Sequence, residues 1–128
     1  MVSLLIVSHS EKIAQGVKEV ALEMSPNICI QGVGGTFEGT LGSDYNKIYD
    51  AMLRLYTSDG VLVLFDLGSS YMNAELAKEA LKLEGKENIH IVDAALVEGS
   101  IVAAVQISLN CSIEAVIESI KGLMLGKK

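Results

Sequence analysis

The chain has 128 residues, half of them apolar, which is enough for a single domain over residues 1–128 and too few for two. Its formal net charge is −6 and it contains no basic patch, which argues against nucleic-acid binding, and no apolar run is long enough to span a membrane. The sequence shows neither a signal peptide nor a metal-type cysteine spacing, so we expect a cytoplasmic protein in which Cys29 and Cys111 are buried free thiols.

Short apolar runs alternate with amphipathic stretches along the chain, which is the pattern of βα units joined into a mostly parallel sheet. The first apolar run predicts a strand over residues 2–7. A helix is expected to begin at Ser10 and Glu11 and to break at Pro26. The residues expected to face the core, chosen by helical spacing, are Ile13, Val17, Val20, Ala21 and Met24.

The second βα unit contains a glycine-rich loop. A predicted strand over residues 28–33 leads into this loop, residues 34–42, and Ser43 or Asp44 then caps a second helix. The apolar residues of that helix fall on one face, and those expected to be buried are Ile48, Met52 and Leu55.

The most apolar run, residues 61–65, predicts a central strand. Residues 66–70 (Asp-Leu-Gly-Ser-Ser) end that strand and begin a third helix, and a short fourth strand over residues 89–92 follows. Two further helices are expected, one very apolar over residues 97–109 and one over residues 113–125. The expected buried residues are Met72, Leu76, Ala80 and Leu83 in the third helix, and Val116, Ile117, Ile120 and Leu123 in the last.

These elements predict an α/β fold: a doubly wound, mainly parallel four-stranded sheet in the order 2-1-3-4, with helices on both faces. In such a sheet the winding reverses between strands 1 and 3, and ligands bind in the crevice at the carboxyl edge there. Small polar loops follow strands 1, 2 and 3. We therefore expect His9 and Asp66 to face each other across this crevice, with the glycine loop beside His9.

His9 is the candidate centre of the chemistry. It closes the first strand between two hydroxyls, and the helix that follows offers free backbone N–H groups, which suit a phosphate. A histidine that carries a phosphoryl group must be neutral at the attacking nitrogen, and its other nitrogen must be held by an acceptor. Asp66 is the predicted acceptor, although a role as a helix cap alone would explain it. A loop histidine without a role is the alternative for His9, and His90, inside a strand, is expected to be structural.

Small and hydroxyl-bearing residues near the three strand ends are the expected phosphate contacts. Ordinary helix-start and turn chemistry would also account for these residue types, and we predict no metal ligands among them. The expected contacts are Ser10, Gly35, Thr36, Gly68 and Ser69.

Other phosphate and nucleotide chemistries fit the sequence less well. The glycines at 34 and 39 have P-loop spacing, but Thr40 and Leu41 stand where Lys and Ser or Thr belong. A dinucleotide fingerprint would follow the first strand, not the second. An aspartyl-phosphate receiver domain needs carboxylates after the first strand, where this chain has Ser8, His9 and Ser10. A non-catalytic regulatory or ligand-binding module remains the alternative.

Three short motifs occur in order along the whole chain: Val7-Ser8-His9-Ser10, Asp66-Leu67-Gly68-Ser69 and Leu96-Val97-Glu98-Gly99. Together they resemble the DhaM family, the phosphotransfer subunits of phosphoenolpyruvate-dependent dihydroxyacetone kinases, whose first domain has the mannose-type enzyme IIA fold. Mannose-transporter IIA domains usually have Thr-His-Gly at the histidine and Gly-Gly-Ser-Pro after the aspartate, and this chain has neither. This difference favours the dihydroxyacetone system, and a mannose-type IIA component of sugar transport is the alternative. The chain departs from the DhaM pattern at Ala95, where Pro is common, and at residues 42–44, where Gly-Thr-Ser is common.

The resemblance implies a phosphotransferase reaction sequence. A phosphoryl group would pass from phosphoenolpyruvate through enzyme I and the phosphocarrier HPr to His9, at Nε2, and then to ADP held on the nucleotide-binding L subunit. The resulting ATP would phosphorylate dihydroxyacetone on the K subunit. The chain would thus need no cofactor of its own, because the ADP and ATP stay on the partner subunit.

The apolar residues of the helix over residues 97–109 surround it instead of forming one stripe, so packing one face on the sheet leaves apolar surface outside. A second copy is the simplest cover, which predicts a homodimer with Ala104 or Val105 facing the partner. The resemblance also favours a dimer. The alternative is that the last helix covers this surface within one chain.

Overall fold

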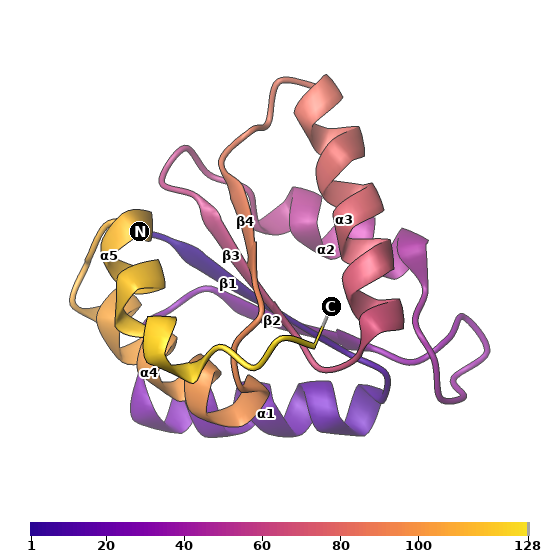
Figure 1. The fold of residues 1–128 in the computed structure, drawn as a ribbon, viewed down its shortest axis with the longest axis horizontal. Helices are drawn as coiled ribbons and strands as arrows, with labels where there is room; N and C mark the ends of the chain where they lie inside the picture. The colour runs from indigo at the N-terminus through magenta and orange to yellow at the C-terminus, as the bar shows by residue number, and fades with distance from the viewer. Residues whose placement is uncertain (128) are drawn as a thin grey trace.

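The computed structural model describes residues 1–127, which form a four-stranded parallel sheet with five α-helices and one short 3₁₀-helix (Figure 1). In chain order the elements are β1 (Ser3–Ser8), α1 (Glu11–Met24), β2 (Ile30–Gly34), α2 (Tyr45–Leu55), β3 (Val61–Phe65), α3 (Gly68–Leu83), β4 (Ile89–Val92), α4 (Leu96–Ser108), α5 (Ile113–Ser119) and η1 (Lys121–Leu123).

The strand order is β2-β1-β3-β4 with every pair parallel, which confirms the predicted fold class and sheet order. β1 lies between β2 and β3, and Val7 pairs with Val33 on one side and Phe65 on the other. The carboxyl ends of these three strands therefore lie level with one another. This arrangement brings the segments after β1, β2 and β3 to one edge of the sheet.

The two faces of the sheet build two cores. α1, α4 and α5 cover one face, where they pack on Leu4, Ile6, Leu62 and Leu64. α2 and α3 cover the other, where they pack on Leu5, Val7, Val63 and Phe65. β1 and β3 are buried along their whole length because both of their faces carry helices, as expected for central parallel strands.

The predicted buried faces of α1 and α3 were partly wrong. In α1, Val17 and Ala21 are buried as expected, but Ile13, Val20 and Met24 are exposed. In α3, all four predictions fail: Ala80 is only half-buried, and the large side chains Met72, Leu76 and Leu83 are exposed. The residues buried instead are mostly small: Ala14 in α1, and Ser70, Ala74, Ala77 and Leu81 in α3.

Close approach of the helix to the sheet explains the small residues on the buried face of α1. A Cβ placed on Gly32 of β2 would lie 2.6 Å from the backbone oxygen of Ala14, so α1 nearly touches the strand. Large side chains do not fit into so narrow a gap, so helical spacing alone wrongly assigned them to the buried face. In α2, where the buried face carries Ile48, Met52 and Leu55, the prediction is confirmed.

The C-terminal part of the chain also differs from expectation. α5 ends at Ser119 and is followed by η1, so the predicted helix over residues 113–125 is too long. Ala104 is fully buried in the core shared by α1, α4 and α5, so it cannot face a second copy, and Val105 is half-buried.

Both cysteines are free, but Cys29 is exposed and Cys111 half-buried, which corrects the expectation of buried thiols. No helix within residues 1–127 is long and apolar enough to cross a membrane.

Two glycine-to-alanine substitutions should have opposite effects on stability. A Cβ on Gly34, at the end of β2, would lie 2.4 Å from the backbone oxygen of Ser10, so Gly34→Ala should lower the free energy of unfolding by about 1–3 kcal/mol. Gly16 lies inside α1 with no neighbouring atom within 4 Å of an added Cβ, so Gly16→Ala should raise it by about 0.5–1 kcal/mol. Urea unfolding followed by circular dichroism measures both, and equal effects would contradict the close packing of β2 on α1.

Candidate functional site

The backbone of His9 is held from two sides at the carboxyl edge of the sheet. Its N–H donates to both carboxylate oxygens of Asp66 at 3.1 Å, and its carbonyl oxygen accepts a hydrogen bond from the Gly42 N–H at 2.7 Å. The side chain is half-buried, and Nδ1 is buried with no hydrogen-bond partner among the described residues. This geometry leaves Nε2 as the ring nitrogen available for chemistry.

The Asp66 carboxylate joins the end of β1 to the beginning of α3. Besides the His9 N–H, it accepts hydrogen bonds from the Ser8 hydroxyl at 2.6 Å, the Leu67 N–H at 2.7 Å and the Ser70 hydroxyl at 3.3 Å. Hydrogen bonds to a charged acceptor are stronger than those between neutral groups. The structure therefore brings Asp66 to His9 as the sequence predicts, but its contact is with the backbone of His9 and not with the imidazole. The expected hydrogen bond from the ring to Asp66 is absent in this structure.

The glycine loop packs beside His9. Its turn is closed by the Thr36 N–H, which donates to the Thr40 carbonyl at 2.9 Å, and by a hydrogen bond of 2.7 Å between the two threonine hydroxyls. Gly35 has a φ of +76°, which favours glycine at that turn. Through Gly42, the far end of this loop reaches the His9 carbonyl.

Lys47 of α2 fixes the near end of the same loop, and sequence reasoning missed it. Its ammonium donates to the carbonyl oxygens of Gly34 and Thr36, both at 3.1 Å, and lies 3.8 Å from the Glu11 carboxylate. A lysine on an amphipathic helix carries no sequence signal of such a contact, since the acceptors are backbone atoms of a distant loop.

The remaining predicted phosphate contacts lie at the two helix starts of this edge. Ser10 caps α1, where its hydroxyl accepts from the Ile13 N–H at 3.4 Å, and Ser69 is exposed in the first turn of α3. Gly68 is the first residue of α3, whose N-cap residue Leu67 provides no side-chain cap. The first N–H groups of α3 therefore remain suited to an anion. Contact of Ser10, Gly35, Thr36, Gly68 and Ser69 with a phosphate stays a prediction.

His90 lies away from this edge. It pairs with Leu62 inside the sheet, and its Nε2 lies 2.8 Å from the Asn88 side-chain oxygen. Burial, helped by the charge of Lys78, lowers the pKa of His90 below its usual value. A satisfied, neutral histidine within a strand is consistent with a structural role.

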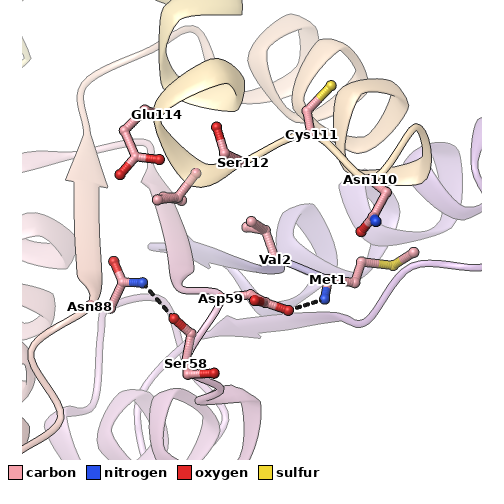
Figure 2. Close-up of a pocket in the computed structure, with 10 residues that line it drawn as sticks. Met1, Val2, Ser58, Asp59, Asn88, Asn110, Cys111, Ser112 and Glu114 are labelled. Atoms are coloured by element: carbon pink, nitrogen blue, oxygen red, sulfur yellow. Dashed lines mark hydrogen bonds and ion pairs between the residues drawn. The ribbon is translucent and has the colours of Figure 1, made fainter.

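A surface cavity of about 430 Å³ lies not at His9 but at the opposite, amino edge of the sheet. There the Met1 ammonium pairs with Asp59, and the Asn88 amide donates to the Ser58 carbonyl (Figure 2). A smaller hollow of about 280 Å³ lies next to the candidate site, between the first turn of α1 and residues 39–41 of the glycine loop. No group of three or more His, Cys, Asp or Glu side chains within residues 1–127 is arranged to hold a metal ion.

Residues 3–117 match the family model EIIA-man, described as the PTS system fructose IIA component. A phosphoryl donor subunit DhaM of a phosphoenolpyruvate-dependent dihydroxyacetone kinase from Listeria innocua is 39% identical and covers 94% of this chain and 97% of its own length. The DhaM subunit of a PTS-dependent dihydroxyacetone kinase from Lactococcus lactis is 31% identical and covers 97% of both chains. The DhaM subunit of Escherichia coli is 36% identical over 91% of this chain but only 26% of its own length.

Two solved structures have a similar fold. A crystal structure of a protein of unknown function, EF1359, superposes with a TM-score of 0.84 at 34% identity and covers 99% of this chain and 96% of its own. The EIIA component of the phosphotransferase system of Streptococcus agalactiae superposes with a TM-score of 0.61 at 16% identity, which shows a shared fold only.

Proposed function

The chain belongs to the EIIA-man family as a DhaM-like phosphotransfer subunit, and from this premise we propose that His9 accepts a phosphoryl group from phospho-HPr and passes it to ADP on the L subunit of dihydroxyacetone kinase. The chain is then a carrier within the kinase, and the nucleotide stays on the partner. The observation that carries the proposal is the fixation of His9 at the carboxyl edge, with Nδ1 buried and its backbone bonded to Asp66 and Gly42.

The proposed transfer is a simple displacement at phosphorus. Neutral Nε2 of His9 attacks the phosphoryl group on the donor's histidine, a new P–N bond forms, and the donor's P–N bond breaks with its electron pair returning to the donor ring. In the second step a terminal phosphate oxygen of ADP attacks, and His9 regains its neutral imidazole. The Asp66 carboxylate stabilises the positive charge that the ring carries between these steps.

The groups around His9 support an anionic intermediate. The N-terminus of α3 presents N–H groups from Gly68 and Ser69. The glycine loop adds Gly35 and the hydroxyl side chain of Thr36, whose N–H is already bonded to the Thr40 carbonyl. We propose that these groups and Ser10 contact the phosphoryl oxygens. Helix N-termini bind phosphates in this way because their first N–H groups have no partner within the helix.

Exposed apolar side chains near His9 favour the proposal that its phosphoryl donor and acceptor are proteins. Phe37 and Leu41 in the glycine loop are 86% and 70% exposed, and Leu67 beside Asp66 is 51% exposed. Large apolar side chains are the usual anchors of a protein interface.

The alternative, a IIA component of sugar transport, would use the same histidine but a different acceptor. The two functions are distinguished by whether label passes to ADP on the L subunit.

We predict that His9 is the only phosphorylated residue. His9→Ala should abolish labelling from radioactive phosphoenolpyruvate, enzyme I and HPr, whereas His90→Ala should leave it largely intact, because His90 lies in β4 opposite Leu62, away from the carboxyl edge that holds His9. The label should be lost in acid and survive base, as expected for a P–N bond. Label that persists in His9→Ala and is released by hydroxylamine would indicate an acyl phosphate and contradict the proposal.

Replacement of the Asp66 carboxylate by an amide should slow phosphoryl transfer to His9. Asp66→Asn removes the charge that holds the His9 backbone, and we expect single-turnover transfer from phospho-HPr to fall by about ten- to ten-thousand-fold. Asp44→Asn is the matched control, because Asp44 caps α2 by accepting the Asn46 N–H at 2.8 Å. If both variants transfer at the wild-type rate, Asp66 is only a helix cap.

We also propose that the chain forms a homodimer, through a different surface from the one first expected. Since Ala104 is buried, α3 is the better candidate: Met72, Leu76 and Leu83 are 67%, 59% and 90% exposed. Sedimentation at micromolar concentration should give twice the mass of the chain. Leu76→Glu should dissociate the dimer, and Ile13→Glu on α1 should leave it intact. A wild-type monomer would contradict the proposal.

A further inference from the structure

The segment after η1 returns to the carboxyl edge of the sheet. Met124 forms an antiparallel bridge with Ala94, the Leu125 N–H donates to the Asp93 carbonyl at 3.1 Å, and the Lys127 N–H donates to the Asp93 carboxylate at 2.5 Å. Figure 1 shows this segment in yellow, running from η1 to the end of the described chain. These bonds guide the Lys127 side chain to the ends of β3 and β4.

The ammonium of Lys127 is partly shielded from water at this point. It donates to the carbonyl oxygens of Phe65 at 2.5 Å and Ala94 at 2.6 Å, lies 4.7 Å from the centre of the Phe65 ring, and is 3.7 Å from the Asp93 carboxylate. Its side chain is 18% exposed. Burial lowers the pKa of Lys127, and the charges of Asp93 and Asp66 oppose this shift. A lysine is seldom buried this far unless its charge is compensated.

This ammonium lies next to the candidate site along the backbone. The Phe65 carbonyl that accepts from Lys127 belongs to the peptide group that links Phe65 to Asp66, and the Asp66 carboxylate holds the His9 backbone. Phe65 also pairs with Val7, two residues before His9. One chain of contacts therefore runs from Lys127 through the end of β3 to His9.

The charge at this edge becomes more negative when His9 is phosphorylated. A phosphoryl group adds about −1.5 to −2 charges at neutral pH, and it would do so near the carboxylates of Asp66 and Asp93. The chain as a whole already carries a formal charge of −6. A fixed, poorly hydrated cation beside Asp66 offsets that repulsion more effectively than an exposed one, because water screens it less.

We propose that Lys127 is a positioning residue for phosphoryl transfer: it holds the end of β3 in place and supplies a fixed, partly buried positive charge that stabilises the phosphorylated state of His9. This inference rests on the proposed function, and nothing in the sequence pattern indicated it. It acts through Asp66 and the backbone of β3, without direct contact with the phosphoryl group.

The test compares three variants in the reversible transfer from phospho-HPr. Lys127→Gln keeps a hydrogen-bond donor for the two carbonyls but removes the charge, and Lys127→Arg keeps the charge. Lys121→Gln is the matched control, because Lys121 is 68% exposed and pairs only with Glu118, at 3.5 Å, among the described residues. Circular dichroism establishes that each variant is folded, and Lys127→Met replaces Lys127→Gln if the glutamine variant is not.

We expect Lys127→Gln to lower the equilibrium ratio of phosphorylated chain to phosphorylated HPr by about three- to tenfold. The fraction of the variant that can take up label should equal that of the wild type. Lys127→Arg and Lys121→Gln should remain within about twofold of wild type. An unchanged ratio in Lys127→Gln overturns the inference, and so does an equal loss in Lys127→Arg, which would indicate a purely structural contact. If the wild-type chain takes no label from HPr at all, the proposed function itself fails, and the two failures are thereby distinguished.

Discussion

Donors from two neighbouring segments converge on the Asp66 carboxylate: Ser8 and His9 at the end of β1, and Leu67 and Ser70 at the start of α3. A single side chain thus sets the position of His9 relative to the N-terminus of α3. The carbonyl of His9 is held by the glycine loop, so its backbone has little freedom in either direction. If His9 carries the phosphoryl group between two protein partners, as proposed, it benefits from this rigidity, since neither partner has to order the backbone on binding.

The fold could be predicted from sequence because its signals are local. Apolar runs separated by amphipathic stretches indicate βα units, and the right-handed crossover rule restricts their order. What could not be predicted was the rotation of α1 and α3 about their axes. For α1, that rotation depends on how closely the helix approaches the sheet, and Gly32 of β2 allows a close approach to Ala14, a residue distant from it in sequence. The sequence gives no sign of whether a large apolar side chain such as Met72 in α3 faces the sheet or the solvent, and it is exposed.

The site was predictable in part for a related reason. The level ends of parallel strands bring His9 and Asp66 together whatever their side chains do, so topology alone indicated the pair. Which atoms meet depends on rotamers and on competing donors, and the backbone N–H groups reach the carboxylate instead of the ring. Lys47 and Lys127 were missed because their acceptors are carbonyl oxygens, which every residue has and no sequence pattern distinguishes.

Cys29 gives the molecule a practical property. Its thiol is exposed immediately before β2, while its carbonyl accepts the Leu4 N–H at the amino end of the sheet. Leu4 lies near the start of β1 and His9 directly follows its last residue, so the two sites are separated by about the length of β1. A fluorescent dye coupled through maleimide to Cys29 would therefore lie away from the proposed donor-binding surface around His9. Energy transfer from such a dye to a labelled partner could follow the encounter in real time without obstructing it.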